Sequence, residues 1–530
     1  MNLSEAANGP AFDAIIIGGG INGSAIAAEC ARRGLRVAML EREDFGFGTT
    51  WRSTKLIHGG LRYLEHGDVR LVFESLRERA WLLRAKPHLV VPQRFILPML
   101  PWTRRPAWQL RAGLGTYDIL ATGGRVPRHQ GLSHDEMFEA APFLTPLATD
   151  GFAFFDARAL SAERLTLELA LLAESRGAFI SNHTEVERIE VAGGRVCGVR
   201  IQTAEGASVI PARAVVNAAG PWVDAVNAVI EVGAGPLLGV TRGTHIAVEL
   251  DGPLPTDAIF SSAREDGRVF FAVPQDQLLL IGTTDVRFDG PPGDVRPTPA
   301  DVEYLLREAN ALLPGLAISA DRVRYAYAGL RPLQRVAGGP EAAITRRHSL
   351  IDHGQSGGPA GLLSVIGGKL STFRPLAREV AEYLGKGRPI EVPAFRIVVG
   401  GEVRPLLLPA RARQRVYGPA WSKIAAAGET ILCDVCGMVR GEIVHAVSAE
   451  HATTVSDVIL RRSGTGWLPQ RGFCCAEAVA VEMASLLAWT VEQRRAEFEQ
   501  FAADARFHLP TPPEILADAG VEMSIERDDA

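Results

Sequence analysis

The chain has 530 residues, of which 47% are hydrophobic and 22% charged, and its formal net charge is -5. This length exceeds what one hydrophobic core usually supports, so we expect two or three domains. The ordinary composition excludes a disordered or repeat protein, and the small negative charge argues against nucleic acid as a partner.

The N-terminal segment has the pattern of a strand, a glycine-rich turn and a helix. Residues 12–17 form a short apolar run that ends at Gly18, Gly20 and Gly23, and small residues follow at helical spacing. These glycines fit GxGxxG, in which they allow a tight turn, the close approach of a pyrophosphate and the packing of helix on strand. The phosphates are then stabilised by the free N–H groups of the helix N-terminus.

A second apolar run, residues 35–40, ends at Glu41, eighteen residues after Gly23. A carboxylate at this place accepts hydrogen bonds from the ribose hydroxyls of a dinucleotide. The order of strand, glycines, helix, strand and acid therefore predicts a dinucleotide-binding unit. The glycine pattern does not separate FAD from NAD, because the same unit binds both.

A longer motif follows in residues 53–66, STKLIHGGLRYLEH, which closely resembles the signature of FAD-dependent glycerol-3-phosphate dehydrogenases of the aerobic, respiratory type. The resemblance recurs in five later segments, which are NAAGPW (217–222), GTH (243–245), GTTD (282–285), GLRPL (329–333) and GGKLST (367–372). It is strong over about residues 12–385 and looser beyond them. It implies FAD as the cofactor and oxidation of sn-glycerol 3-phosphate to dihydroxyacetone phosphate as the activity.

The resemblance also implies an α/β fold in three parts. A discontinuous Rossmann-like FAD-binding domain is expected from residues 10–80, 150–225 and 350–385. An inserted substrate-binding domain with an antiparallel sheet is expected from residues 81–149 and 226–349, and a helical C-terminal domain from residues 386–530. The residue pattern agrees with this three-part fold. Short apolar runs that end in glycine are typical of core strands that return to a cofactor, and the apolar residues of the C-terminal part have helical spacing.

Oxidation of a secondary alcohol by flavin needs a hydride to pass from carbon to N5 of the isoalloxazine while a base takes the hydroxyl proton. Histidine is the natural base, and two histidines lie in the family motifs. His58 is in the glycine-flanked IHGG, where the chain can approach the flavin, and His245 is at the start of a substrate-domain strand. The sequence leaves the choice between them open.

The phosphate of the substrate requires a fixed cation, and the planar fork of arginine matches it bidentately. The resemblance points to Arg331 and to Arg62 with its neighbour Tyr63, while Lys369 is expected to bind the flavin or to stabilise negative charge on the reduced ring. The predicted catalytic residues are His58, His245, Arg331 and Lys369. The predicted substrate-binding residues are Arg62, Tyr63, His245 and Arg331.

The expected FAD site draws on all of these motifs. Its glycines let backbone N–H groups approach the cofactor, and Thr372 adds a hydroxyl group. The predicted cofactor-binding residues are Gly18, Gly20, Gly23, Glu41, Thr54, Lys55, Leu56, His58, Gly60, Ala219, Gly220, Gly368, Lys369, Leu370 and Thr372. Asp285 is expected to order its own loop through its acceptor oxygens and is left out of the catalytic set.

The respiratory family implies a membrane quinone as electron acceptor and a protein that lies on the bilayer surface. Residues 98–114 interleave Trp102 and Trp108 with three arginines, a mixture that suits the headgroup interface, although a solvated basic loop over a core helix has the same composition. The sequence has neither a secretory signal nor the roughly 18 consecutive apolar residues of a spanning helix. We therefore expect a cytoplasmic protein, peripheral on the cytoplasmic face of the inner membrane, and a homodimer is compatible with the resemblance.

Six cysteines, at positions 30, 197, 433, 436, 474 and 475, are too few and too unevenly spaced for a secreted disulfide framework and are expected to be reduced thiols. Cys433 and Cys436 have CxxC spacing, but the adjacent pair Cys474 and Cys475 would have difficulty in ligating one metal together. The sequence therefore predicts incidental buried thiols and no metal site.

Four alternatives stay open. Another phosphorylated polyol, such as a tetritol phosphate, would use the same phosphate clamp and base, and an oxygen-using glycerol-3-phosphate oxidase would differ in its acceptor. An amine or amino-acid oxidase shares the flavin architecture but needs a carboxylate clamp. The alternative from another class is a non-catalytic flavoprotein. Trp51 and Arg52, which precede the signature, differ from the residues usual at these positions in the family. They lie near the expected flavin.

Overall fold

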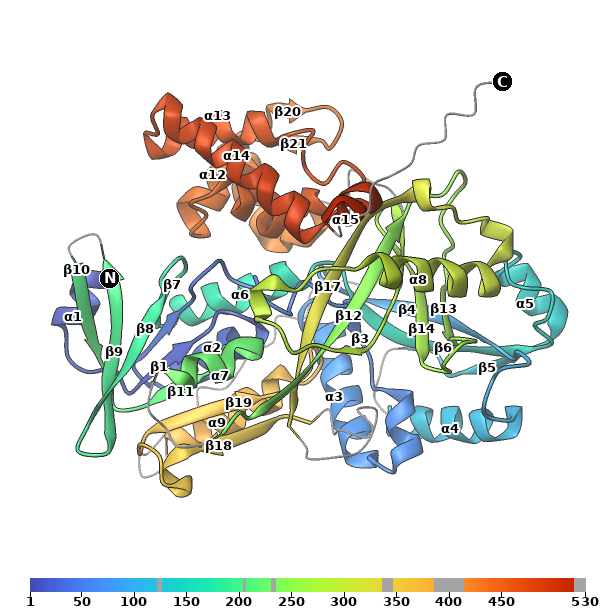
Figure 1. Ribbon diagram of the computed structural model, residues 1–530, viewed down its shortest axis with the longest axis horizontal. Helices are drawn as coiled ribbons and strands as arrows, with labels where there is room; N and C mark the ends of the chain where they lie inside the picture. The colour runs from blue at the N-terminus through green and yellow to red at the C-terminus, as the bar shows by residue number, and fades with distance from the viewer. Residues whose placement is uncertain (122–125, 204–205, 230–234, 336–346, 386–413, 519–530) are drawn as a thin grey trace.

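The computed structural model describes residues 1–121, 126–203, 206–229, 235–335, 347–385 and 414–518, with the side chains of Arg62, Glu65 and His66 excepted. The described chain forms two large sheets and a group of C-terminal helices that contacts the parts built on both of them (Figure 1). The predicted α/β architecture with a helical C-terminal region is confirmed.

The first sheet has six strands and places the N-terminal strand near its centre. In order across the sheet, the strands are β18 (Ser349–Asp352), β19 (Leu362–Ile366), β11 (Val215–Asn217), β1 (Ala14–Ile17), β2 (Val37–Leu40) and β7 (Phe179–Ser181). All neighbours run parallel except β18, which is antiparallel to β19 at one edge. Every residue of β1 and β2 is buried, as expected for a parallel sheet covered on both faces.

Alternate residues of β1 reach the two different layers that cover this sheet. Ala14 and Ile16 pack against helices, whereas Ile15 and Ile17 pack against a small antiparallel sheet. The helices are α2 (Ile21–Arg32), α6 (Ala162–Glu174) and α9 (Phe373–Leu384). The small sheet consists of β8 (Val186–Ala192), β9 (Arg195–Thr203) and β10 (Gly206–Pro211), with α1 (Leu3–Asn8) beside it.

The second sheet has ten strands and lies beside the first (Figure 1). Its main order is β16 (Val286–Arg287), β12 (Leu238–Val248), β15 (Leu278–Gly282), β14 (Val269–Gln275), β13 (Ala258–Ser262), β4 (Val90–Pro98), β6 (Gly151–Ala159) and β3 (Leu56–Ile57). In addition, β17 (Val323–Gln334) pairs with β12, and β5 (Gln130–Leu132) pairs with β6. The sheet is antiparallel, as expected, except that β4 and β13 are parallel.

Helices pack on both faces of this sheet. The face that includes Ile96 packs against α5 (His134–Ala140) and α8 (Pro299–Leu312), and the face that includes Phe95 packs against α4 (Ala107–Leu120). α3 (Val69–Ala85) in turn packs against α4.

The N-terminus of α8 is fixed to β12. Thr298 and Asp301 form a reciprocal capping box, with Pro299 in the first turn. The Asp301 carboxylate also accepts a hydrogen bond from the Thr244 hydroxyl at 3.0 Å. This contact anchors β12 at the residue directly before His245.

The division into domains stays a prediction, but the pairing of two strands bears on its boundaries. β3 and β6 form hydrogen bonds within the ten-stranded sheet, although their residues fall in ranges assigned to the FAD-binding domain. An apolar run in a sequence indicates that a strand is buried but does not identify the strand beside it.

The C-terminal region is mainly helical over residues 414–518. Its helices are α11 (Trp421–Ala427), α12 (Arg440–Ala449), α13 (Ala476–Leu487), α14 (Val491–His508) and α15 (Pro512–Asp518), with a hairpin of β20 (Ile431–Cys433) and β21 (Met438–Val439) after α11. Apolar residues of the hairpin, α12, α13 and α14 form one cluster with Trp51 and with Tyr325 and Tyr327 of β17, whereas Ile515 of α15 packs with the ten-stranded sheet. Among the helices in the described ranges, none is long and apolar enough to cross a membrane.

Candidate active site

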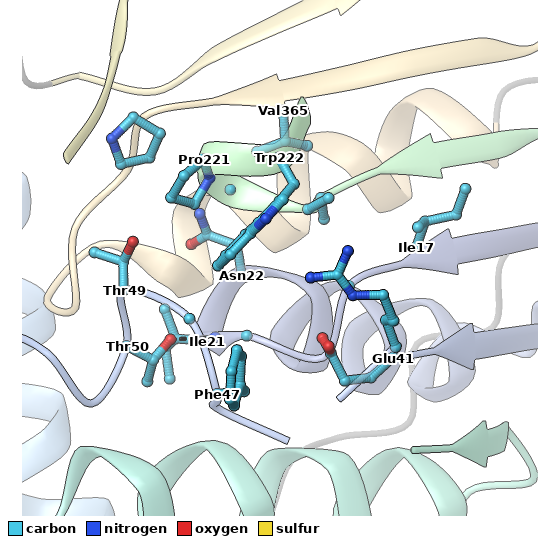
Figure 2. Close-up of a pocket in the computed structure, with 18 of the residues that line it drawn as sticks. Ile17, Ile21, Asn22, Glu41, Phe47, Thr49, Thr50, Pro221, Trp222 and Val365 are labelled. Carbon is cyan, nitrogen blue, oxygen red and sulfur yellow. Dashed lines mark hydrogen bonds between the residues drawn. The ribbon is translucent and has the colours of Figure 1, made fainter. Parts of the chain in front are cut away.

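A pocket lies at the carboxyl end of β1. It is at the point where the sheet order reverses, because β1 has β2 on one side and β11 on the other, which is where open α/β sheets bind ligands. Its wall is formed by the turn after β1, the end of β2 and the loops that follow β11 and β19. Figure 2 shows Pro221 and Trp222 on one side of the space and Phe47 and Thr50 on the other.

The turn between β1 and α2 depends on two glycines. Gly18 has a φ of +107°, and a Cβ atom there would lie 2.7 Å from the backbone oxygen of Ala218. A Cβ atom on Gly23 would lie 1.9 Å from the backbone oxygen of Gly18. The first glycine therefore allows β1 to approach the loop after β11, and the second allows α2 to pack on the turn.

We expect Gly23→Ala to produce protein with little bound flavin. The added methyl group would push the α2 N-terminus away from the turn that must cradle a pyrophosphate. Flavin absorbance per protein after purification measures this loss. Gly113→Ala in α4 is the matched control, because a Cβ atom at Gly113 meets no atom within 4 Å. Equal flavin content in both variants would contradict this role of the turn.

Glu41 lines the pocket and also holds the glycine turn. Its carboxylate accepts hydrogen bonds from the backbone N–H of Gly19 at 2.6 Å and from that of Glu43 at 2.9 Å. Burial raises the pKa of this carboxyl, and the two backbone donors act in the opposite direction. Glu41 therefore lies where a ribose would be bound while it tethers the end of β2 to the turn.

Asn22 is a pocket residue that the sequence analysis missed. Its Nδ2 donates a hydrogen bond to the backbone oxygen of Gly367 at 3.2 Å, which joins α2 to the loop after β19. Its Oδ1 is buried and accepts no hydrogen bond from the described part of the chain. Asn22 occupies a variable position of GxGxxG, so the motif gives no signal for it. A buried acceptor in the pocket wall is suited to a polar ligand.

The predicted cofactor-binding residues divide into two groups. Those that line the pocket are Gly18, Gly20, Glu41, Ala219, Gly220, Gly368, Lys369 and Leu370. Of the others, Gly23 shapes the turn, Leu56 belongs to β3 and lies in the apolar cluster of Phe95, and Thr372 precedes α9 as its N-cap residue. Gly60 has a φ of +79° and starts the short helix Leu61–His66.

Lys55 does not direct its side chain toward the pocket. Its Nζ lies 3.0 Å from Oε1 of Glu163 and 3.3 Å from the centre of the Trp467 ring, and both charged side chains are only 1% exposed. Burial lowers the pKa of Lys55, and the charge of Glu163 opposes that shift. The side chain of Lys55 thus forms a buried ion pair that joins the signature to α6 and the C-terminal region, and its predicted contact with FAD stays a prediction.

His245 lies in β12, opposite Tyr327 of β17 and Gly282 of β15. Its ring stacks on Tyr327 with centroids 4.9 Å apart, and its Nε2 lies 2.9 Å from Oγ1 of Thr54. Burial, together with the positive charge of Arg331, lowers the pKa of His245 to about 3. The imidazole is therefore neutral at physiological pH and can accept a proton.

The position of Arg331 is set by the pairing of β17 with β12, the strand that contains His245. Its Nη1 donates to Oδ1 of Asp285 at 2.9 Å, and its Nη2 donates to Oγ1 of Thr283 at 2.9 Å. Asp285 thus helps to fix the orientation of the guanidinium. The side chain of Arg331 is 21% exposed, and the next residue, Pro332, lines the pocket. Arg331 is thus a fixed and partly accessible cation beside the pocket wall.

The remaining predicted residues lie in two places. Lys369 lines the pocket, and its Nζ is 3.7 Å from the centre of the Tyr63 ring, so these two predicted residues are brought together. His58 is half-buried after β3 and does not line the pocket. The side chain of Arg62 lies outside the described part of the chain.

Trp51 and Arg52 turn away from the pocket although their neighbours Thr50 and Ser53 line it. Trp51 packs edge-on against Trp467 with ring centroids 5.4 Å apart. Arg52 Nη2 lies 2.8 Å from Nδ1 of His508 at the end of α14. The side chains of Trp51 and Arg52, the two residues that differ from the family's usual sequence, therefore contact the C-terminal region.

Comparison with known proteins gives a consistent result. Residues 13–374 match the family model of FAD dependent oxidoreductases, and residues 414–494 match that of the C-terminal domain of alpha-glycerophosphate oxidase. A glycerol-3-phosphate dehydrogenase of Synechocystis sp. is 34% identical over 94% of this chain and 97% of its own length. An aerobic glycerol-3-phosphate dehydrogenase of Staphylococcus saprophyticus is 34% identical over 71% of this chain and 67% of its own.

Solved structures of related proteins have the same fold. The glycerol-3-phosphate dehydrogenase of Bacillus halodurans complexed with FAD superposes with a TM-score of 0.76 at 25% identity, covering 95% of this chain and 96% of the other. The L-alpha-glycerophosphate oxidase of Mycoplasma pneumoniae shares the fold, with a TM-score of 0.56 at 18% identity over 73% of this chain and 97% of that one.

The pocket residues fit the cofactor of this family. The glycine turn leaves no room for a Cβ atom, the acid follows the second strand, and Asn22 presents a buried acceptor. The chain is an FAD-dependent oxidoreductase and belongs to the family of FAD-dependent glycerol-3-phosphate dehydrogenases.

Proposed function

We propose that this protein oxidises sn-glycerol 3-phosphate to dihydroxyacetone phosphate. The observation that carries the proposal is the pairing of β12 with β17, which brings the charge of Arg331, the residue before Pro332 of the pocket wall, close to the neutral His245. The names of the relatives support the same substrate. When bound, FAD takes up the two electrons and the carbon-bound hydrogen that the alcohol loses.

His245 is the proposed base. In a neutral imidazole one ring nitrogen carries no proton, and it can take the proton of the substrate's secondary hydroxyl. Stacking on Tyr327 and the contact with Thr54 hold the ring in one orientation. Because burial lowers the pKa of His245, the ring is unprotonated at neutral pH.

Arg331 is the proposed phosphate-binding residue. Asp285 and Thr283 fix the orientation of the guanidinium, and its partial exposure leaves the charge available to an anion. Lys369, held against Tyr63 at the pocket wall, adds a second positive charge near the flavin site. These two cations distinguish a phosphorylated polyol from the free polyol.

The substrate proposal is tested by steady-state oxidation with an artificial electron acceptor. Glycerol 3-phosphate, glycerol and a tetritol phosphate are compared at equal concentration. The proposal requires the highest kcat/KM for glycerol 3-phosphate. A higher kcat/KM for the tetritol phosphate would reassign the substrate, and oxidation of free glycerol at the same rate would remove the role of the phosphate cations.

We further propose that electrons pass to a membrane quinone and that α4 rests on the cytoplasmic face of the inner membrane. Trp108 is 69% exposed and Ile119 is 71% exposed, and their spacing places both on one face of this helix. Exposed aromatic and aliphatic side chains next to arginines are typical of an interfacial helix.

The double variant Trp108→Ser and Ile119→Ser should sediment less with vesicles that contain anionic lipid, because it loses the two apolar side chains that would enter the headgroup region. Val191→Ser is the matched control, since Val191 is 40% exposed on β8, away from α4. Unchanged sedimentation of the double variant would exclude α4 as the membrane contact.

A further inference from the structure

Three cysteine sulfurs in the C-terminal region lie together. The Sγ atoms of Cys433, Cys436 and Cys474 are all within 4.8 Å of one another. Cys433 and Cys436 are buried, and Cys474 is half-buried. From the sequence these thiols were expected to be incidental, because the adjacent Cys474 and Cys475 would have difficulty in ligating one metal together. The fold brings the hairpin to the start of α13, where only Cys474 of this adjacent pair joins Cys433 and Cys436.

The hairpin β20–β21 forms one half of this cluster. Cys433 ends β20, and its backbone oxygen accepts a hydrogen bond from the N–H of Gly437 at 2.8 Å. Gly437 has a φ of +66°, which only glycine adopts at little cost. This tight turn directs the sulfurs of Cys433 and Cys436 to the same side, as a pair of metal ligands requires.

The start of α13 forms the other half. Cys475 is the N-cap residue of this twelve-residue helix, so Cys474 and Cys475 both lie at its positive end. A helix N-terminus stabilises a thiolate. The thiol of Cys433 donates to the backbone oxygen of Cys474 at 3.1 Å, and the thiol of Cys475 donates to the backbone oxygen of Gly472 at 3.3 Å.

We propose that Cys433, Cys436 and Cys474 bind one Zn²⁺ ion as thiolates, with a water molecule in the fourth position on the side where Cys474 is half-buried. Zn–S bonds of about 2.3 Å in a tetrahedron separate the sulfurs by about 3.8 Å, so the three sulfurs need to approach one another by no more than about 1 Å. Each thiol releases its proton to solvent when it binds the ion. Thiolates select zinc over magnesium or calcium.

A single ion suits this geometry better than an iron–sulfur cluster. A two-iron cluster distributes four thiolates over two metal ions, whereas here three sulfurs surround one small space. The ion would join the hairpin to α13 at the edge of the apolar cluster that includes Met438 and Trp467. Its role would be to stabilise the C-terminal region rather than to take part in the oxidation.

Metal analysis of the FAD-loaded protein, purified after expression with added zinc, tests this proposal. We expect one zinc per chain in the wild type and loss of most of it in Cys433→Ser and in Cys474→Ser. Cys197→Ser is the control and should keep its zinc, because Cys197 is an exposed residue of β9. Substitution of Co²⁺ should give thiolate-to-metal absorption bands in the wild type and in the control variant.

If the serine variants do not fold, titration of the wild type with a chelator still tests whether the protein binds zinc. Removal of zinc should lower the Tm, and zinc but not magnesium should restore it. The proposal is overturned if the wild type takes up no zinc, if it contains iron with acid-labile sulfide, if a disulfide joins these cysteines, or if Cys433→Ser retains as much zinc as the control.

Discussion

His245→Asn should lower kcat by about 100- to 10,000-fold while the flavin spectrum stays that of the wild type. The asparagine cannot take up the proton of the substrate hydroxyl, but β12 and the cofactor pocket keep their structure because His245 does not line that pocket. Rapid-reaction measurement of flavin reduction gives the rate of the chemical step directly. The sequence left His58 and His245 equally open, so His58→Asn is measured beside it.

Two neighbouring variants sharpen this test. Thr54→Val removes the hydroxyl beside Nε2 of His245 but keeps the imidazole, so it should cost far less activity. Gly282→Ala should resemble His245→Asn, because the added Cβ would lie 2.3 Å from Cδ2 of His245 and would displace the ring. If His58→Asn abolishes flavin reduction and His245→Asn does not, the base is wrongly assigned.

The lowered pKa of His245 has a consequence for stability. With a pKa of about 3 in the folded protein and 6.5 as the ordinary value, the unfolded chain binds more protons than the folded chain between these two values. The free energy of unfolding therefore falls as the pH is lowered through this range, and His245→Asn should show a smaller fall than the wild type. Denaturant unfolding at pH 7 and pH 5 measures the difference.

Arg331→Leu should lower kcat/KM for glycerol 3-phosphate by about 100- to 1000-fold, which corresponds to about 3–4 kcal/mol. The variant loses the fork that would bind the phosphate, and Asp285 loses its partner. Arg331→Lys should recover only part of the activity, because an ammonium group cannot make the same bidentate contact. Steady-state kinetics over a wide range of substrate concentration separates KM from kcat.

Free glycerol provides the control for Arg331. Its slow oxidation should be almost unchanged in Arg331→Leu, because glycerol carries no phosphate. Loss of Arg331 also removes a charge that lowers the pKa of His245, so this pKa should rise toward its ordinary value in the variant. Equal losses for glycerol and glycerol 3-phosphate would mean that Arg331 supports the fold rather than binding the phosphate.

The cofactor-binding residues of the glycine turn could be predicted from the sequence, because the residues that specify that turn are close along the chain. A tight turn that admits no Cβ atom needs Gly18 and Gly23, and the steric reason lies within a few residues of each glycine. The parallel strands around this turn could be predicted for the same reason, since their apolar runs end in glycine. Asn22 was missed because its contact with Gly367 depends on a loop that approaches from a distant part of the chain.

The substrate half depends on contacts that the sequence does not encode locally. His245 and Arg331 come together only because β12 pairs with β17. Lys55 belongs to the same signature as His58, yet its side chain turns to Glu163. The cysteine cluster is a third case, since its two halves meet only through the packing of a hairpin on a helix. In each case, residue type and spacing identified the candidates, but only the tertiary fold decides their partners.

Anaerobic mixing of the FAD-loaded protein with glycerol 3-phosphate tests the central claim most directly. The absorbance of the oxidised flavin is followed in parallel with glycerol and with a longer polyol phosphate. We expect rapid bleaching by glycerol 3-phosphate and little by free glycerol. Bleaching only by the longer polyol phosphate would contradict the proposed substrate, and no bleaching by any of the three would contradict the dehydrogenase function itself.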